Sequence, residues 1–320
     1  MRQERVIVVS PRKSGTHLVQ KLMTALGYGI YGEPVPPESG RAAVSLRERL
    51  ELAERFLHPD EFAALDVRED TKEFIRRTDR LLIQLGWIWQ TRLAARNLSN
   101  VDLIRPEIDF ELRMSEDAWT RPFWQTAPRL CWIFHSLDIW RMDQKFLNEW
   151  TTRQAPAMVL NHRDPRDALV SMANFFSGKS GITFRRFPES AVFGPILANL
   201  PDMESRITYM LTDPTIPLLH DYEAAVSWYH HPQVCKVAFE ELAGPEGGGS
   251  RARQLAAVER VAGWAGTDAD PEAVVGELFD RRSFTFHKGR IGAWREVFTA
   301  RHSALFDARF GHLTDMFGYA

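Results

Sequence analysis

Three short apolar runs along the chain predict strands that are buried on both faces. They cover Arg5–Ser10, Ala157–Asn161 and Val234–Phe239. Continuous apolar runs of this length are typical of a parallel sheet with helices on both sides, whereas strands with one wet face alternate polar and apolar residues. A further apolar run, Leu130–Phe134, is equally short and ends at His135.

Helical patterns follow two of these runs and fill much of the remaining sequence. After the first run, Leu18, Leu22 and Leu26 recur at helical spacing. After the second, Asp164 and Pro165 have the residue types of a helix cap and a first helical position. Further helices are predicted at 46–65, 71–98, 138–150, 223–230, 251–265, 271–281 and 303–317. Proline and glycine predict loops at 30–45 and 244–250 and a long excursion at 177–222.

This alternation of strands and helices predicts an α/β fold with a doubly wound, mostly parallel sheet. The chain has 320 residues, a length that suits two domains or one large one. Because we find no internal repeat and no long linker, we expect a single domain over 1–320. Residues 30–127 would form a largely helical insert in it.

Charge and cysteine content narrow the classes of partner. The 40 Lys and Arg residues nearly balance the 42 Asp and Glu residues, for a formal net charge of -2. Without a basic field we expect no nucleic-acid partner. Cys131 and Cys235 are too few for a disulfide framework, and the first apolar stretch is too short for a signal peptide or a membrane span. We therefore expect a cytoplasmic protein without membrane association, and its oligomeric state stays open.

A turn of small and basic residues, PRKSGT, joins the first predicted strand to its helix. In such a turn backbone N–H groups converge at the positive end of the helix, which favours a bound phosphate. Lys13 adds a full charge, and Ser14 and Thr16 add hydroxyl donors beside Gly15. The strict GxxxxGK[ST] pattern is absent, because Lys13 precedes the glycine. Taken alone, the motif also fits a solvated turn with a surface lysine.

The segment NHRDPRDALVS repeats this arrangement after the second strand. Arg163 lies at the carboxyl end of that strand, where open α/β sheets bind ligands, and Ser171 follows about two helical turns later. Arg163 is therefore a candidate for a bidentate contact to phosphate. The structural alternative has Arg163 paired with Asp164 or Asp167, the carboxylates that favour the start of the helix.

A third segment, HKGRIGAW, combines glycines with positive charge near the C-terminus. His287, Lys288 and Arg290 surround Gly289. Flexible backbone with clustered charge suits an anion, although a basic surface turn has the same composition.

Together the three segments resemble the cytosolic-type sulfotransferases, a family that uses 3'-phosphoadenosine 5'-phosphosulfate (PAPS) as sulfuryl donor. RKSGT at 12–16 is similar to the family's PKSGT, RDPRDALVS at 163–171 to RNPKDxxVS, and HKGRIGAWREVFT at 287–299 to RKGxxGDWKxxFT. The order and spacing match over nearly the whole chain, but 30–127 matches poorly. The resemblance implies a P-loop-like sulfotransferase fold, PAPS as cofactor and adenosine 3',5'-bisphosphate as product.

The resemblance also implies roles for single residues. The cofactor would contact Arg12, Lys13, Ser14, Gly15, Thr16, His17, Arg163, Ser171, Phe239, His287, Lys288 and Gly289. The first loop would hold the 5'-phosphosulfate, while Arg163 and Ser171 would hold the 3'-phosphate with help from the late loop. Phe239 stands where the family often has a tyrosine, so a hydroxyl contact is missing, and His287 replaces an arginine.

The catalytic residues implied by the resemblance are His135 and Lys13. PRLCWIFHSL at 128–137 is similar to the family's PRLxKTHLP, which makes His135 the general base, although the family's lysine before it is missing. An ordinary imidazole titrates near pH 6.5 and can take the acceptor's proton, while Lys13 would neutralise charge on the leaving phosphate. A hydrogen-bonded core histidine is the structural alternative for His135.

The acceptor is expected to be a small hydrophobic molecule with a hydroxyl group. Seven of the ten tryptophans lie between 87 and 150, the stretch with little family resemblance. Pockets for organic ligands are mostly apolar and aromatic, so this region and 177–222 are expected to line the acceptor site. For each tryptophan taken singly, packing between helices is the simpler explanation.

Two other classes of function stay open. A P-loop kinase or other NTPase would need Mg²⁺, a lysine after the glycine and an acidic residue at a strand end, where this chain has Asn161-His162-Arg163. A nucleotide-binding module without catalysis would use the same phosphate contacts. The sulfotransferase scheme needs no metal, and no HxxxH or CxxC pattern indicates one.

Overall fold

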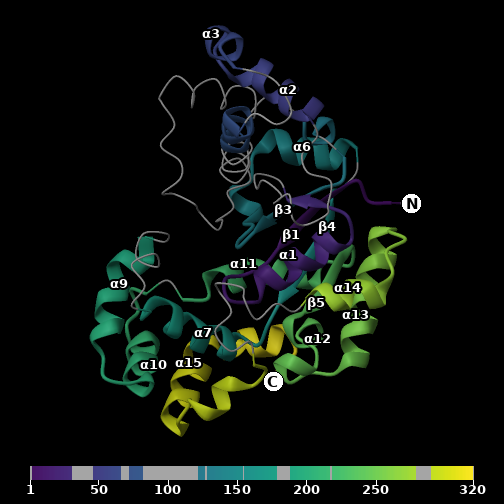
Figure 1. The fold of residues 1–320 in the computed structure, drawn as a ribbon. Helices are drawn as coiled ribbons and strands as arrows, with labels where there is room; N and C mark the ends of the chain where they lie inside the picture. Colours follow the sequence, from purple (N-terminus) through teal and green to yellow (C-terminus); the bar gives the residue numbers. More distant parts are fainter. Residues whose placement is uncertain are drawn as a thin grey trace.

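A five-stranded parallel sheet in the order β2-β3-β1-β4-β5 forms the centre of the protein (Figure 1). The strands are β1 (Arg5–Val9), β2 (Gly29–Ile30), β3 (Leu130–Phe134), β4 (Ala157–His162) and β5 (Val234–Ala238). The computed structural model describes residues 2–30, 46–65, 72–81, 122–126, 128–153, 155–178, 188–216, 218–278 and 290–319. The predicted α/β class with a parallel sheet is confirmed.

The register brings the ends of the central strands level. Val9 of β1 pairs with both Phe134 of β3 and Leu160 of β4. The chain runs from β1 outward to β2, returns through β3 and then crosses β1 to reach β4 and β5. The strand order therefore reverses around β1, and the turns after β1, β3 and β4 emerge at this switch point, where open α/β sheets bind ligands.

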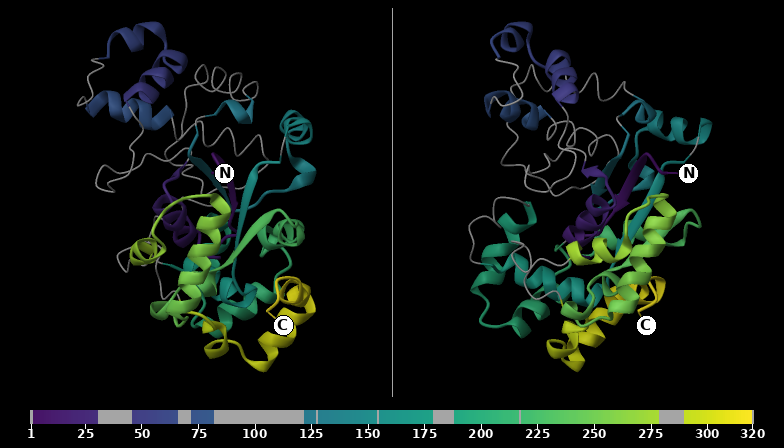
Figure 2. Two further views of the ribbon diagram at one scale, coloured as in Figure 1. Left: turned by 90° about the vertical axis from the view of Figure 1, so that its right-hand side faces the viewer. Right: turned by 45° about the vertical axis from the view of Figure 1, so that its right-hand side comes forward.

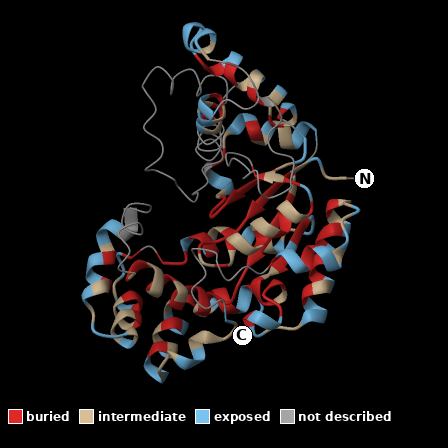
Figure 3. Ribbon diagram, in the orientation of Figure 1, coloured by how far each residue is buried: buried red, intermediate tan, exposed pale blue. Residues whose placement is uncertain are grey.

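Helices cover both faces of the sheet, as the continuous apolar runs predict (Figures 2 and 3). Val6 and Val8 of β1 belong to the core on one face, which includes residues of α1 (Thr16–Ala25), α13 (Arg251–Ala265) and α14 (Pro271–Leu278). Ile7 and Val9 belong to the core on the other face. That core includes residues of α6 (Gln144–Thr152), α7 (Pro165–Phe176), α10 (Met203–Thr212), α11 (His220–His230) and α15 (Ala300–Met316). Alternate residues of a strand point to opposite faces, so one apolar run serves two cores.

The described part of 30–127 is mainly helical and has a core of its own. It contains α2 (Leu46–Phe56), α3 (Pro59–Ala63), a helical segment at 72–81 and the short helix η3 (Phe123–Gln125). Ala53, Phe56 and Phe74 are buried together in a cluster separate from those at the sheet. Within the described residues, no helix combines the length and the apolar character needed to cross a bilayer.

Several predicted elements differ from the observed ones. The helix predicted at 46–65 is interrupted before Pro59, because proline disfavours a helical residue ahead of it. The run Leu130–Phe134 is a full strand, and β2 is too short to carry a sequence pattern. The helix predicted at 138–150 is split into η4 (Ile139–Arg141) and α6. Residues 82–98 and 279–281 of two other predicted helices lie outside the described residues.

The predicted excursion over 177–222 contains helices that the sequence did not indicate. The segment includes α9 (Pro188–Asn199) and α10, and α11 begins at His220. Pro195 lies inside α9. The remaining described elements are α12 (Phe239–Leu242), η5 (Pro245–Gly247) and η6 (Ala293–Glu296).

Candidate functional site

Four turns at the carboxyl edge of the sheet each carry a candidate residue of the site. They come directly after β1, β3, β4 and β5, and they carry Lys13, His135, Arg163 and Phe239 respectively (Figure 1). His287, Lys288 and Gly289 of the third motif lie outside the described residues, and the structure describes that motif from Arg290 onward.

The turn after β1 has an unusual backbone. Lys13 has a φ of 66° and Gly15 a φ of 97°, both in the left-handed region. A residue with a side chain rarely adopts this conformation, and such outliers gather at functional sites. A Cβ atom on Gly15 would also lie 2.6 Å from Cδ2 of Phe239, so the turn requires glycine here. Gly15 is the N-cap of α1, whose first amide groups have no intrahelical carbonyl to bind, and this leaves donors at the turn.

Below the turn, a hydroxyl network orders the side chains that the sequence predicts as phosphate donors. Asn161 Nδ2 lies 2.9 Å from both Ser10 Oγ and Ser14 Oγ, and donates to the Ser14 carbonyl at 3.0 Å. Ser10 Oγ donates to Thr16 Oγ1 at 3.0 Å, so Ser14 Oγ is the donor in its 3.1 Å contact with Ser10. This assignment leaves the Thr16 hydroxyl proton for a ligand. Sequence reasoning missed Ser10 and Asn161, although a polar residue that ends a buried apolar run was the available signal.

Lys13 is half-buried and shares the site with a second cation. Its Nζ lies 4.4 Å from the centroid of the Phe175 ring. Burial, and then the positive charge of Arg163, lower the pKa of Lys13 from 10.5 to about 8. Burial of two neighbouring cations is unfavourable, and a bound anion would stabilise the protonated form of Lys13.

We expect anion binding to weaken as the pH rises through about 8, because only protonated Lys13 attracts an anion and its pKa is lowered to about 8. A bound anion would raise this pKa again. Calorimetric titration with adenosine 3',5'-bisphosphate between pH 6.5 and 9.5 measures the effect. Lys13→Met should weaken binding at pH 7 and remove the alkaline loss. An unchanged alkaline loss in Lys13→Met would assign it to another group.

Arg163 connects three turns of the site. Its guanidinium lies over the ring of Phe239 at 4.2 Å, and its Nη2 donates to the Arg290 carbonyl at 2.9 Å. Nη1 lies 3.4 Å from the Lys13 carbonyl oxygen. Nε is buried and has no hydrogen-bond partner among the described residues. An arginine held flat on an aromatic ring, with a donor unused, is suited to bind an oxyanion.

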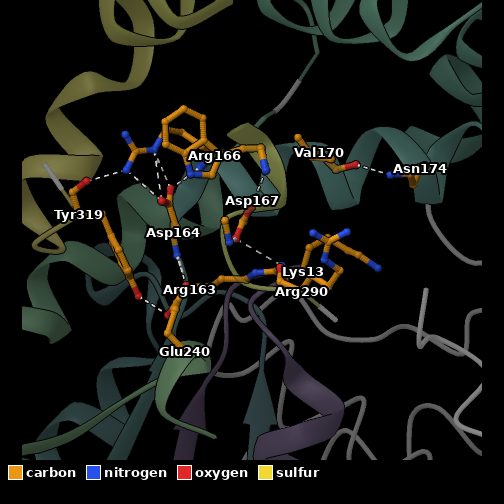
Figure 4. A network of polar contacts seen from close by, with 12 residues as sticks. Lys13, Arg163, Asp164, Arg166, Asp167, Val170, Asn174, Glu240, Arg290 and Tyr319 are labelled. Carbon is orange, nitrogen blue, oxygen red and sulfur yellow. Dashed lines mark hydrogen bonds and ion pairs between the residues drawn. The ribbon is translucent and has the colours of Figure 1, made fainter. Parts of the chain in front are cut away.

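The carboxylates next to Arg163 have separate partners (Figure 4). Asp164 caps α7 and is paired with Arg166 at 2.9 Å, which contradicts the alternative of an Arg163–Asp164 pair. Asp167 lies 3.6 Å from Arg163, so that part of the structural alternative is present, though only loosely. Its oxygens instead accept the backbone N–H groups of Gly292 and Trp294, and it is therefore more than the helix-start carboxylate that the sequence predicts.

A buried network behind β4 supports the same turn from the other side. Tyr319 Oη donates to Glu240 Oε2 at 2.7 Å and lies 2.9 Å from Nδ1 of His162. Glu240 in turn accepts the Asp164 amide at 3.0 Å. The tyrosine hydroxyl has one proton, which it donates in the hydrogen bond to Glu240. In the other contact the tyrosine oxygen must accept, so His162 Nδ1–H is the donor. These contacts fix the backbone from which Arg163 extends.

His135 extends from the end of β3 toward the first turn. Its Nδ1 lies 2.9 Å from the Ser10 carbonyl oxygen, which can only accept a hydrogen bond, so Nδ1 carries the proton and Nε2 the lone pair. Nε2 is buried and has no hydrogen-bond partner among the described residues. Burial, opposed by the negative charge of Asp221, lowers the pKa of His135 to about 4. The imidazole is therefore neutral at pH 7 with its lone pair on Nε2, and the buried, hydrogen-bonded ring also matches the structural alternative of a core histidine.

Arg12 forms a buried ion pair that the sequence did not indicate. Its Nε donates to Oδ2 of Asp221 at 2.5 Å, and the two side chains are 8% and 3% exposed. Asp221 lies in the first turn of α11, 209 residues along the chain, so no local pattern predicts the contact. The pair ties the first turn to α11, and the charge of Arg12 is compensated within the protein.

The remaining predicted residues are less clearly part of the site. His17 is half-buried in the first turn of α1, and Ser171 is half-buried on α7 beyond the Arg163 turn. Phe239 is buried as the first residue of α12, between Gly15 and Arg163. Among the described residues, no three His, Cys, Asp or Glu side chains gather as a metal site would require.

Most of the described tryptophans between 87 and 150 pack in the core. Trp132 is buried beside Phe123 at 4.8 Å, and Trp150 stacks on Trp228 at 5.7 Å. Trp140 differs, because it is 92% exposed on η4, shortly after His135. Trp87, Trp89 and Trp119 lie outside the described residues. The expectation that this region lines an acceptor pocket stays a prediction.

Comparison with known proteins finds likenesses in structure but not in sequence. No protein-family model matches the chain, and no curated protein matches it. A crystal structure of mouse sulfotransferase SULT7A1 complexed with PAP is similar, with a TM-score of 0.49, 12% identity, and coverage of 98% of this chain and 84% of that one. Retinol dehydratase in complex with androsterone and inactive cofactor PAP has a TM-score of 0.47 and 16% identity, with coverage of 98% of this chain and 81% of that one. Retinol dehydratase in a complex with retinol and PAP has a TM-score of 0.43 and 16% identity, with coverage of 98% of this chain and 82% of that one. These values assign no role to a single residue.

Proposed function

We propose that the protein is a PAPS-dependent sulfotransferase, which moves a sulfuryl group to the hydroxyl of a small hydrophobic acceptor. One observation carries the proposal: the left-handed turn at Lys13, the guanidinium of Arg163 and the neutral imidazole of His135 meet at one edge of the sheet. The order of the three sequence segments supports the same conclusion, because they resemble the family's donor-binding segments.

The chemistry of the described residues fits a nucleotide with two separated anionic groups. At one end, the left-handed turn and the Thr16 hydroxyl offer donors around Lys13. At the other, Arg163 has an unused buried donor at Nε. Charge-assisted hydrogen bonds from such groups to phosphate are short and strong. We assign the 5'-phosphosulfate to the first turn and the 3'-phosphate to Arg163.

In this reaction PAPS supplies the sulfuryl group, whose bond to the 5'-phosphate oxygen breaks as a bond to the acceptor oxygen forms. His135 Nε2 takes the acceptor's hydroxyl proton, while the Ser10 carbonyl holds the ring in the tautomer that makes this possible. Protonated Lys13 stabilises the charge that develops on the leaving phosphate oxygen. Arg163 and the turn hold the nucleotide so that the reacting atoms are in line.

A phosphoryl transferase of the NTPase type is less well supported by the residues present. The turn after β4 is cationic at Arg163, and Asp221, a buried carboxylate that contacts the first turn, is paired with Arg12. A magnesium-dependent mechanism would instead place an acidic residue at the phosphates.

Transfer of labelled sulfate from PAPS to a panel of phenols, alcohols, amines and sugars tests the proposal directly. We expect turnover with at least one hydrophobic phenol or alcohol. Adenosine 3',5'-bisphosphate should raise the melting temperature in the presence of a chelator, and MgATP should not. Stabilisation by MgATP alone would favour the NTPase alternative and reject the sulfotransferase.

Arg163→Gln should weaken the binding of adenosine 3',5'-bisphosphate by roughly 10- to 100-fold, the range expected for losing a charged hydrogen bond. Binding of 5'-AMP should change little, because it has no second phosphate. Calorimetry with both nucleotides measures the ratio. The control is Arg260→Gln, which removes an arginine that is paired with Glu241 near the surface. An equal loss for both nucleotides would contradict the assignment of Arg163 to the 3'-phosphate.

A further inference from the structure

We propose that Asp167 is a positioning residue, which docks the turn at 290–294 against Arg163 and so aims the guanidinium at the second phosphate. This inference rests on the proposed function, because it concerns the arginine assigned there to the 3'-phosphate. It adds a residue that acts through Arg163 and does not itself contact the nucleotide.

The contacts of Asp167 are directed at backbone N–H groups (Figure 4). Its Oδ2 accepts from the Gly292 amide at 2.7 Å, and its Oδ1 accepts from the Trp294 amide at 2.9 Å. The carboxylate has no exposed surface. Two charge-assisted hydrogen bonds from one buried carboxylate hold a segment that is 125 residues away in sequence.

The turn has further anchors at the start of α7 and at η5. The Arg290 carbonyl accepts from Arg163 at 2.9 Å, and the Ile291 amide donates to the Gly247 carbonyl at 3.0 Å. The guanidinium of Arg166 lies over the Trp294 ring, 4.1 Å from its centroid. Arg163 thus contacts, at Arg290, a turn that Asp167 helps to hold.

The geometry also explains why a carboxylate can lie beside Arg163 without occupying it. Nη2 of Arg163 and Oδ2 of Asp167 are 3.6 Å apart, longer than a hydrogen bond. Both Asp167 oxygens are engaged by N–H groups of the turn. Asp167 therefore offsets the buried positive charge without itself accepting a hydrogen bond from Arg163.

A substitution of Asp167 should change nucleotide binding in opposite directions according to whether the residue acts only through its charge or by docking the turn. A negative group close to a phosphate site repels the ligand, so removal of that charge should tighten binding. Loss of docking should weaken binding, because Arg163 would no longer be held. The direction of the change therefore separates the two roles.

The test compares wild type with Asp167→Asn and with Glu296→Gln as a matched control. Glu296 pairs with Arg290 in the same segment, but the pair is exposed and does not dock the turn. We expect Asp167→Asn to weaken the binding of adenosine 3',5'-bisphosphate by about tenfold and to change the binding of 5'-AMP by less than about twofold. The reason is that the substitution removes the buried charged hydrogen bonds that hold the turn. Glu296→Gln should change neither. Hydrogen exchange without nucleotide should be faster at the amides of Gly292 and Trp294 in Asp167→Asn only.

Either of two results would overturn the inference. Binding that stays unchanged or becomes tighter in Asp167→Asn would leave Asp167 without a positioning role. Fast exchange of the Gly292 and Trp294 amides in the wild-type protein would show that the docking is absent, and this measurement needs no variant to fold. Wild type that binds neither nucleotide would reject the proposed function, whereas the exchange result would still decide the docking.

Discussion

His135→Asn is expected to lower the rate of sulfuryl transfer by about 100-fold or more, which is the usual contribution of a general base. Nucleotide binding should change little, because the imidazole faces the acceptor's proton and not the phosphates in the proposed reaction. The cause is the loss of the Nε2 lone pair, which the Ser10 carbonyl fixes by binding Nδ1–H. Steady-state rates with saturating PAPS and acceptor measure the effect.

The pH dependence of the same reaction gives a second readout of His135. Because burial lowers the pKa of His135 to about 4, its basic form is present throughout the neutral range and is lost only as the pH falls toward 4. The rate assigned to this group should therefore be flat near pH 6.5, where an ordinary histidine would titrate. A limb at pH 6.5 that disappears in His135→Asn would contradict the buried, neutral imidazole.

The matched control is His302→Asn, which removes another buried histidine. His302 completes the capping box of α15 with Thr299, and its Nε2 lies 2.8 Å from Thr208 Oγ1 of α10. We expect a lower melting temperature with the transfer rate of the folded enzyme nearly unchanged. Full activity in His135→Asn would remove His135 as the base, whatever the control shows.

Gly15→Ala is expected to abolish tight nucleotide binding and to destabilise the fold. A left-handed residue with a side chain costs about 1–2 kcal/mol, and the new Cβ would lie 2.6 Å from the Phe239 ring. The ring cannot move freely, because the Arg163 guanidinium lies over it at 4.2 Å. The collision therefore disturbs the two anion-binding ends together. Chemical unfolding and calorimetry with adenosine 3',5'-bisphosphate measure the two effects.

Gly248→Ala separates backbone strain from the collision. Gly248 has a φ of +86°, close to that of Gly15, but a Cβ there has nothing within 4 Å. This variant should lose a similar amount of stability from its backbone while binding nucleotide like wild type. If Gly15→Ala binds nucleotide as well as Gly248→Ala does, the first turn is not the phosphate site.

The sequence predicted the parts of the site that depend on local pattern. A buried apolar run with small or basic residues directly after it located the turns at Lys13 and Arg163, and these turns are where the structure has them. Strand ends carry this signal because parallel strands are buried along their length, while the turns after them reach the ligand-binding edge of the sheet.

Contacts between distant segments had no such signal. The pair of Arg12 with Asp221 joins residues far apart in the chain, and Asp167 looked like a helix-start carboxylate because its amide partners lie in another segment. Likewise the helix α9 was not predicted, since Pro195 is ordinarily a helix breaker. Local propensity describes an element, whereas tertiary packing selects its partners.

A crystal structure of the protein with adenosine 3',5'-bisphosphate would show the two phosphate positions directly. We predict the 5'-phosphate on the turn at 12–16 beside Lys13, the 3'-phosphate at Arg163, and the acceptor hydroxyl within hydrogen-bonding distance of His135 Nε2. A nucleotide bound anywhere else, or bound with its two phosphates away from Lys13 and Arg163, would contradict the proposed site.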